Sequence, residues 1–272
     1  MSGISNGRRR RVVVAASWVL VCMLPVPSPA QSQGDLSGLL RLVRRLHADG
    51  DYAGALRELR AGQQRDPGSY DVRCWTAEIL MDSAELLSRS GTRAPAMSLA
   101  EEALRHARAA VGSRRRGAEG WFQVGRATGT ISQLSGGPES VQMARESKSA
   151  FETAISLDSS HASALHGLAR WHRAVASVSA IERAAASLFF GGLPPASRED
   201  AVQLFRRAAA LEPDASEHHL ELAKTYLELD RNDLARAELE IVVGLLEARR
   251  GDAARKEEAR RLLGSMAAGR RP

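Results

Sequence analysis

Histidines are the side chains in this sequence that most readily bind metals or transfer protons, and there are seven of them. His218 and His219 are adjacent, so their side chains would point about 100° apart on a helix. His161, His166 and His172 lack the spacing of four residues that places two metal ligands on one helix face. The histidines therefore predict no metal site, and we expect them to pack between helices or to line a groove.

The sequence also lacks the motifs that identify common enzyme classes. There is no G-x-S-x-G nucleophile motif, no glycine-rich phosphate loop and no H-E-x-x-H zinc motif. The carboxylate pairs Glu101–Glu102 and Glu257–Glu258 are typical of solvated helix faces. We therefore expect no catalytic residue and no cofactor, and an enzyme is the least supported class of function.

Residues 1–30 have the composition of a secretory signal peptide. Arg8–Arg11 precede the apolar run Val12–Leu24, and Ser28 and Ala30 have the spacing of a signal-peptidase site. As a helix, the apolar run is shorter than the roughly 30 Å hydrocarbon core of a bilayer, which disfavours a permanent membrane span. The sequence predicts cleavage after Ala30 and export, to the periplasm of a Gram-negative cell, with an uncleaved membrane anchor as the alternative.

Cleavage would change the charge and the cysteine content of the chain. Loss of Arg8–Arg11 lowers the net charge from +6 to +2, which gives no global reason to expect nucleic acid as a partner. Cys74 would be the only cysteine left, so we expect a small buried hydrophobic residue there, with an intermolecular disulfide as the alternative. The basic run Arg114–Arg116 is expected in a solvated loop rather than at an anion site.

A helical pattern repeats along the chain at intervals of about 34 residues, the length of a tetratricopeptide repeat. The first copy has apolar residues at helical spacing, a Gly-Asp-Tyr turn and a second helix that ends before Pro67. The last copy places small and apolar residues at corresponding positions, namely Leu222, Ala223, Tyr226, Ala235, Leu239 and Val242. The pattern predicts an all-α solenoid of helical hairpins, with Trp75, Trp121 and Trp171 as core anchors on inner helices.

Two inner helices are predicted to be longer than a standard repeat allows, Tyr70–Ser88 and Ala162–Leu188. The second runs into FFGGLPPAS, which we interpret as a structural corner, with a ligand loop as the alternative. Leu188, Phe189 and Phe190 are expected to close a hydrophobic layer. The residues expected to cap the helix and to stop it are Gly191, Gly192, Pro194 and Pro195, and Ser197 is expected to be the N-cap of the next helix, with Asp200 three residues later.

The stretch from Leu168 to Asp230 resembles the tetratricopeptide-like domain of the regulator of microtubule dynamics family. The features that carry the resemblance are Arg170-Trp171, IERAAASLF before G-x-x-P, Ala201 with Phe205, and LAKTYLEL, and weaker similarity extends back to about residue 70. The resemblance implies a non-enzymatic helical scaffold linked to microtubules, and in one branch an organelle tether that binds phospholipid. The predicted export signal departs from that family's pattern and argues against microtubule binding.

The predicted organisation is a signal peptide over residues 1–30, a short linker over 31–34 and a helical repeat domain over 35–248. Residues 249–272 are expected to form a capping helix with a basic tail, because their charges alternate and apolar residues are few.

One pair of positions recurs in the four inner helices that align best. The ninth position of each repeat is a cation and the fifth is mostly apolar, and positions four apart lie on the same helix face. The ninth positions are Arg44, Arg126, Arg170 and Lys224, and the fifth positions are Leu40, Phe122, His166 and Leu220. The pattern predicts a groove for apolar matter that carries a carboxylate or phosphate. The alternative is that these arginines are ordinary exposed helix residues.

The function that we expect is a scaffold that binds an extended or helical protein segment in the concave groove. The alternative is a carrier or sensor of an anionic lipid or amphiphile in the same groove. The oligomeric state does not follow from the sequence.

Overall fold

The computed structural model describes residues 29–268, with side-chain surroundings given from residue 36, and within this range it consists of helices without strands. The twelve helices are α1 (Pro29–Asp49), α2 (Tyr52–Arg65), α3 (Tyr70–Arg89), α4 (Arg93–Ser113), α5 (Ala118–Leu134), α6 (Gly137–Leu157), α7 (Ala162–Ala176), α8 (Ala180–Phe190), α9 (Arg198–Leu211), α10 (Ser216–Glu228), α11 (Asn232–Gly244) and α12 (Asp252–Ala267).

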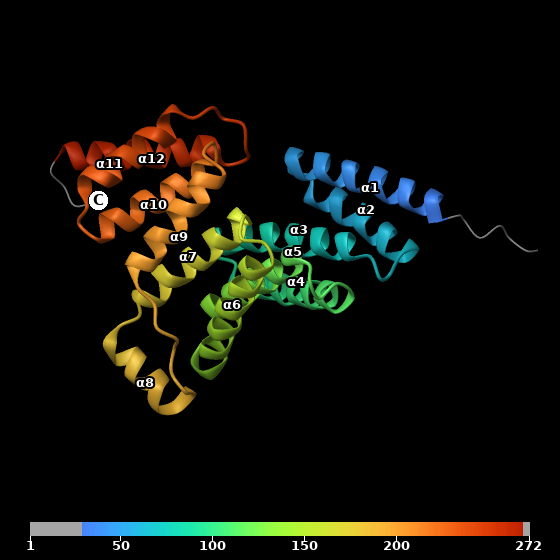
Figure 1. Cartoon of the computed structure of the whole chain (residues 1–272), viewed down its shortest axis with the longest axis horizontal. Coiled ribbons are helices and arrows are strands. Elements are labelled where there is room, and N and C mark those ends of the chain that lie inside the picture. Colours follow the sequence, from blue (N-terminus) through green and yellow to red (C-terminus); the bar gives the residue numbers. More distant parts are fainter. Residues whose placement is uncertain (1–28, 269–272) are drawn as a thin grey trace, which may run out of the picture.

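The helices form stacked antiparallel hairpins, as Figure 1 shows. The hairpins pair α1 with α2, α3 with α4, α5 with α6, α7 with α9, and α10 with α11, while α12 packs on the last pair. The inner helices are therefore α1, α3, α5, α7 and α10. The prediction of an all-α, tetratricopeptide-like solenoid is confirmed, and so is a C-terminal helix that covers the end of the stack.

Small residues allow the helices of this stack to approach closely. Most of the fully buried residues of α4 are alanines, and their short side chains bring its backbone close to α3 and α5. Gly125 of α5 and Gly167 of α7 both face the Phe151 ring of α6. A Cβ atom at Gly167 would lie 2.5 Å from that ring, closer than real Cβ contacts occur. The packing of three consecutive helices thus requires glycine at this position.

The expected helix Ala162–Leu188 is wrong, whereas the long inner helix α3 is confirmed. Helix α7 ends at Ala176, and the separate helix α8 begins at Ala180 with Ser179 as its N-cap. The Ser179 hydroxyl accepts a hydrogen bond from the Glu182 amide, while the Glu182 carboxylate accepts one from the Ser179 amide. This capping box begins a new helix, so residues 177–197 form an insertion between the two helices of the fourth hairpin.

The insertion also places its apolar residues differently from our expectation. Leu188 and Phe189 are 79% and 74% exposed, so they do not close a hydrophobic layer; only Phe190 is partly buried. The reason is that α8 lies outside the stack, against α6, as Figure 1 shows in gold. The expected caps are confirmed: Gly191 and Gly192 have φ of 74° and 79°, and the Ser197 hydroxyl accepts from the Asp200 amide at the start of α9.

The loop before α12 contacts the turn of the first hairpin. The Arg250 guanidinium, in the loop before α12, lies 4.7 Å from the centre of the Tyr52 ring at the start of α2. It also occupies the space that a side chain at Gly50 would need, and Gly50 has a φ of 78°. Figure 1 shows this loop facing the turn between α1 and α2, and we call the contact of Arg250 with this turn the closure of the solenoid.

The N-terminal predictions fall mostly outside the described residues. The proposed signal peptide lies there except for its last two residues, and α1 begins at Pro29. Residues 31–34, expected to be a linker, are instead part of α1. Among the described helices, none has the length and the apolar character that crossing a bilayer requires.

Candidate functional site

The inner helices surround a cavity of about 910 Å³. It is lined by residues of every inner helix, from α1 to α10, and by residues of α6 and α12. Aromatic rings from three successive hairpins, Trp75, Phe122 and Trp171, form part of its wall. Carboxylates and guanidinium groups alternate with these rings, which makes the lining a mixture of apolar and charged surface.

Six of the eight predicted groove residues line this cavity. They are Arg44, Phe122, Arg126, His166, Arg170 and Leu220. The other two do not: Leu40 packs against the core between α1 and α2. Lys224 turns toward α12, where its ammonium lies 2.7 Å from Glu258 and 3.1 Å from Glu221. The predicted stripe of four cations is thus not continuous in the cavity.

Arg126 sits within a group of carboxylates on α3. Its guanidinium lies 2.5 Å from Asp82, 3.3 Å from Glu78 and 3.7 Å from Glu85. Burial by itself would lower the pKa of Arg126, but Glu78 and Asp82 raise it, so the guanidinium stays charged. Because its charge is already neutralised by neighbouring carboxylates, Arg126 is a poor candidate for binding an anionic ligand.

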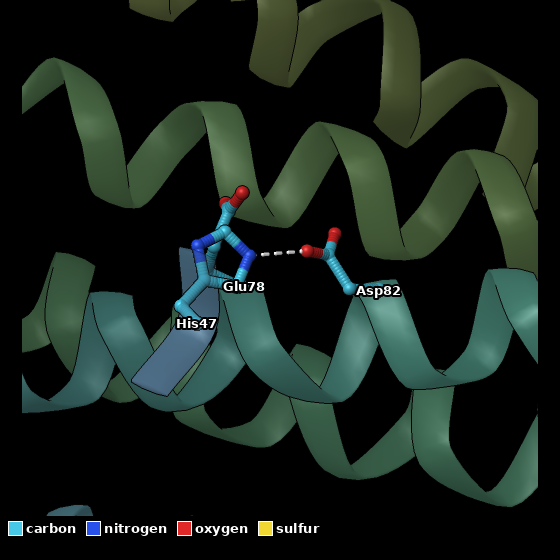
Figure 2. Close-up of side chains that lie close together, drawn as sticks. All are labelled: His47, Glu78 and Asp82. Atoms are coloured by element: carbon cyan, nitrogen blue, oxygen red, sulfur yellow. Dashed lines mark hydrogen bonds and ion pairs between the residues drawn. The ribbon is translucent and has the colours of Figure 1, made fainter. Parts of the chain in front are cut away.

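His47 of α1 completes this cluster, as Figure 2 shows. Its Nε2 lies 2.6 Å from the Asp82 carboxylate, which also accepts a hydrogen bond from Tyr52 at 3.5 Å. The hydrogen bond to Asp82 raises the pKa of His47. Burial tends to raise the pKa of Asp82, but His47 and Arg126 outweigh it and lower that pKa. The network therefore joins α1, α2, α3 and α5 through charged hydrogen bonds.

His47, Glu78 and Asp82 have the residue types of a metal site, with ligand atoms within 4.8 Å of one another. Arg126, however, contacts both carboxylates and supplies the positive charge that a metal ion would bring. A cation would have to displace this guanidinium, so we interpret the cluster as a structural ion-pair network.

Two histidines meet at the opposite wall of the cavity. The Nδ1 atoms of His166 and His218 are 2.9 Å apart, which requires one to donate and the other to accept. Burial lowers the pKa of both imidazoles, and in His166 the neighbouring His218 lowers it further. The lowered pKa values favour the neutral form of both rings, and the unprotonated Nδ1 of one ring accepts the hydrogen bond that links α7 and α10.

Arg44 and Arg170 are the cations of the predicted stripe that remain open to a ligand. Both are exposed and line the cavity, and neither forms an ion pair with another described residue. Arg44 lies 5.8 Å from the Trp75 ring centre, so an apolar surface adjoins its charge. Glu221, which also lines the cavity, is held ionised: burial opposes this, but Arg173, Lys224 and Arg170 lower its pKa to about 2.

The acidic wall, formed by Glu78, Asp82 and Glu85 of α3, does not follow from the four inner helices that align best, because α3 is not one of them. Counted from Tyr70, the fifth residue of α3 is Cys74 and the ninth is Glu78, an acid where the other repeats have a cation. The signal was present in the sequence, since Glu78 and Asp82 are four residues apart and lie on one helix face.

The remaining predicted residues have structural roles. Trp171 is buried and donates from Nε1 to the Ala144 carbonyl at 2.7 Å. Cys74 is 5% exposed, and burial raises the pKa of its thiol to about 12, so the prediction of a small buried residue is confirmed. Arg114–Arg116 are exposed in the loop after α4, where Arg114 lies 4.2 Å from the Tyr70 ring centre.

Comparison with known proteins places these observations in a family. The model of the family described as regulator of microtubule dynamics protein 1-3 matches residues 39–267, which is nearly the entire described chain. Regulator of microtubule dynamics protein 1 of Rattus norvegicus is 34% identical over 89 residues. That match covers 32% of this chain and 29% of the rat protein's length.

Solved structures show the same fold at lower identity. A thermophilic tetratricopeptide-repeat protein of Thermus thermophilus superposes with a TM-score of 0.61 at 19% identity, covering 83% of this chain and 99% of that one. The pilF protein of Pseudomonas aeruginosa gives 0.51 at 13% identity, with 87% of each chain covered. Proteins with this fold generally mediate protein–protein interactions and are generally not enzymes.

Proposed function

Because the chain belongs to the regulator of microtubule dynamics family and folds as a tetratricopeptide-like solenoid, we propose that it is a non-enzymatic scaffold that binds a segment of a partner protein in its cavity. The observation that carries this proposal is the cavity of about 910 Å³ between the inner helices. Its mixture of aromatic and charged residues suits an extended or helical segment that carries both apolar and charged side chains.

The lining indicates which side chains such a segment would carry. Trp75 and Phe122 offer apolar surface, and Arg44 and Arg170 offer cations that have no carboxylate partner among the described residues. A segment with apolar residues and a nearby carboxylate would satisfy both features. Arg126 would contribute indirectly, by offsetting part of the negative charge of the acidic wall.

The proposal is tested by placing a photo-crosslinking amino acid at position 170 of the full chain in its native cells. We expect adducts with a defined polypeptide there, and none at position 207, an exposed arginine of α9 outside the cavity. Arg44→Ala should lower the yield of the adduct, whereas Arg41→Ala, an exposed arginine of the same helix outside the cavity, should not. Equal adducts at positions 170 and 207, or none at 170, would contradict the proposal.

An anionic lipid or amphiphile in the same cavity is the alternative occupant, and ion pairing weakens it. Arg126 and Lys224 already contact carboxylates, which leaves two of the four predicted cations for a head group. Native mass spectrometry of the purified full chain distinguishes the two occupants. A retained phospholipid that Arg170→Ala releases would replace the protein segment as the ligand.

The compartment is part of the same proposal. The arginines and the apolar run of residues 8–24 support export of the chain before it binds its partner. Amino-terminal sequencing of the protein from a periplasmic extract should begin at Gln31. A chain that retains Met1 would favour the anchored alternative.

A further inference from the structure

A hydrogen bond between His166 and His218 links the inner helices α7 and α10. Their Nδ1 atoms lie 2.9 Å apart, so one of these atoms carries a proton and the other does not. Both rings line the cavity, but His218 is only 3% exposed, and its Nε2 atom has no hydrogen-bond partner among the described residues. The Glu212 carboxylate lies 3.9 Å from that Nε2, beyond hydrogen-bond distance. The pair therefore has room for a further proton.

The hydrogen bond limits how many protons the pair can accept. Two neutral imidazoles carry two ring protons, and the bond between the Nδ1 atoms uses one of them. A third proton, taken from the solvent, can bind to the Nε2 atom that is still unprotonated, and the hydrogen bond remains intact. A fourth would place an N–H on both Nδ1 atoms, which face each other at 2.9 Å and could no longer bond. The geometry therefore permits uptake of one proton without breaking this link between α7 and α10.

The charged groups near His218 come from three segments. They are Glu217 and His219 of α10, Glu212 between α9 and α10, and Arg249 before α12. Arg249 lies 2.8 Å from Glu212 and 3.6 Å from Glu217, so it offsets part of the charge of both carboxylates. Arg255 of α12 also lies 3.7 Å from Glu217. Burial lowers the pKa of His218 more than these carboxylates raise it, so its surroundings favour the neutral ring.

The surroundings of His166 also favour the neutral ring. The groups that act on it are His218 and Glu221 of α10 and Arg170 and Arg173 of α7, while Phe205 of α9 contacts it edge-on without a charge. Burial, His218 and Arg170 lower the pKa of His166, and Glu221, which lies 2.6 Å from Arg173, raises it less.

The helices α5 and α6 add no unpaired carboxylate to this wall. The charged residues of α5 that line the cavity, Glu119 and Arg126, contact His161 and the carboxylates of α3, and the residues of α6 that line it, Ser147 and Phe151, are uncharged. Among the described residues, the carboxylates near the histidine pair are thus already paired with cations. A carboxylate that holds a third proton on the pair would have to come from a ligand.

Arg170 is the cation that would bring a partner's carboxylate to this pair. It follows His166 by four residues, so the two side chains share one face of α7, with Cβ atoms about 5–6 Å apart. Both line the cavity, and Arg170 is exposed and forms no ion pair with another described residue. A carboxylate bound there would supply negative charge beside the pair, and an opposite charge within about 4–6 Å favours the charged form of an imidazole.

We propose that a carboxylate of the bound segment, held at Arg170, draws one proton onto the His166–His218 pair, so that acid strengthens binding in the cavity. This inference rests on the proposed function, because it specifies how that binding is regulated. Binding and proton uptake are reciprocal, so a segment that favours the protonated pair binds better where the pair is already protonated. The carboxylate itself stays ionised in mild acid, because the ordinary pKa of a glutamate is about 4.3.

The test measures how adduct formation depends on pH, with a photo-crosslinking amino acid at position 133 of the full chain in an extract of its native cells. Gln133 is exposed, lines the cavity and lies on α5, so both histidines and Arg170 stay in place. From about pH 8 to about pH 5, we expect the yield of the adduct with a defined polypeptide to rise severalfold. His166→Gln should abolish the rise, because glutamine forms hydrogen bonds without titrating. The matched control His172→Gln, a buried histidine of the same helix outside the cavity lining, should retain it.

The outcomes separate this inference from the proposed function. Adducts whose yield does not change with pH, or a rise that His166→Gln retains, would overturn this inference alone. The absence of adducts at every pH would contradict the proposed function and this inference with it. Nitrogen NMR of the histidine rings in the purified full chain examines the pair without a partner: His166 and His218 should titrate together, in one step below pH 6.5. Independent titrations of the two rings would show that they share no proton and would also overturn the inference.

Discussion

At the scale of single residues, charge pairing decides which predicted cations are available. A cation at the ninth position recurs in four inner helices, but α3 has Glu78 there, and Glu78 contacts Arg126 of the neighbouring repeat. A carboxylate in one repeat thus neutralises a guanidinium in the next. The pair is about one-quarter exposed, so losing either partner would leave a largely desolvated charge.

His47 gives a pH-dependent prediction at this scale. Its pKa is raised above 6.5 by Asp82, so the protonated form stabilises the fold fully below pH 6.5, and this contribution is lost as the pH rises through the raised value. His47→Gln should therefore cost about 1 kcal/mol in mildly acidic buffer and progressively less above neutrality. Urea unfolding of both chains across this range provides the measurement.

His106 provides a control of opposite sign. Burial lowers its pKa below 6.5, so the wild-type chain loses stability at this site as the pH falls, and His106→Gln removes that loss. If both variants shift with pH in the same direction, the assigned role of His47 is wrong.

The position of a side chain could be predicted from the sequence where the repeat pattern determines it. It could not be predicted where contacts with residues far away in the sequence determine it. Phe122 and Arg170 line the cavity as the repeat positions indicated. The contact of His47 with Asp82 joins residues 35 apart through the way two hairpins stack, and no local pattern encodes that distance. Lys224 has the expected position in its repeat, but Glu258 of the capping helix draws it away from the cavity.

At the scale of elements, the start of α8 shows that the spacing of apolar residues does not always predict where a helix begins. The alanine-rich stretch after Trp171 has no glycine or proline until Gly191, which is why one continuous helix was expected. The Ser-x-x-Glu sequence at Ser179 and Glu182 was the available signal, because a capping box marks a helix start. The glycine caps were predictable from the same stretch, because glycine readily adopts the positive φ of a helix C-cap. Gly191 and Gly192 both have positive φ.

Gly167 provides a prediction about helix packing. Alanine is the better helix former, yet Gly167→Ala should destabilise the fold by about 1–3 kcal/mol, because its Cβ would overlap the buried Phe151 ring. Thermal and urea unfolding measure the change. Gly264→Ala is the matched control: it lies inside α12 with open space around it, and should stabilise by about 0.5–1 kcal/mol. Equal effects of the two substitutions would mean that Phe151 does not restrict α7.

At the scale of the whole molecule, the repeats curve until the Arg250 side chain of the last loop reaches Tyr52 of the first hairpin. The repeat pattern predicted the hairpin fold but not the contact between the last loop and the first hairpin. The curvature that produces this contact accumulates from small rotations between successive repeats, which the sequence of a single repeat does not reveal. The insertion of residues 177–197 leaves the stack uninterrupted because it lies outside it, and α7 still pairs with α9.

Arg250→Ala tests this closure. Loss of its contact with Tyr52, worth about 0.5–1 kcal/mol for an exposed cation and ring, should accelerate amide exchange at both ends of the solenoid. Hydrogen exchange should rise in the turn around Gly50 and in the loop of residues 245–251, and remain unchanged in α5. The control Arg249→Ala, which breaks contacts with Glu212 and Glu217, should affect only the C-terminal end. Unchanged exchange around Gly50 in the Arg250 variant would show that the ends are not coupled.

Closure has a kinetic consequence for whatever occupies the cavity. A polypeptide with folded domains on both sides of the bound segment that enters between the first hairpin and the last loop has to separate Arg250 from Tyr52. For such a polypeptide, variants that loosen this contact should speed both association and release, with the affinity nearly constant. A single contact between the first hairpin and the last loop would thereby determine how long a partner stays bound.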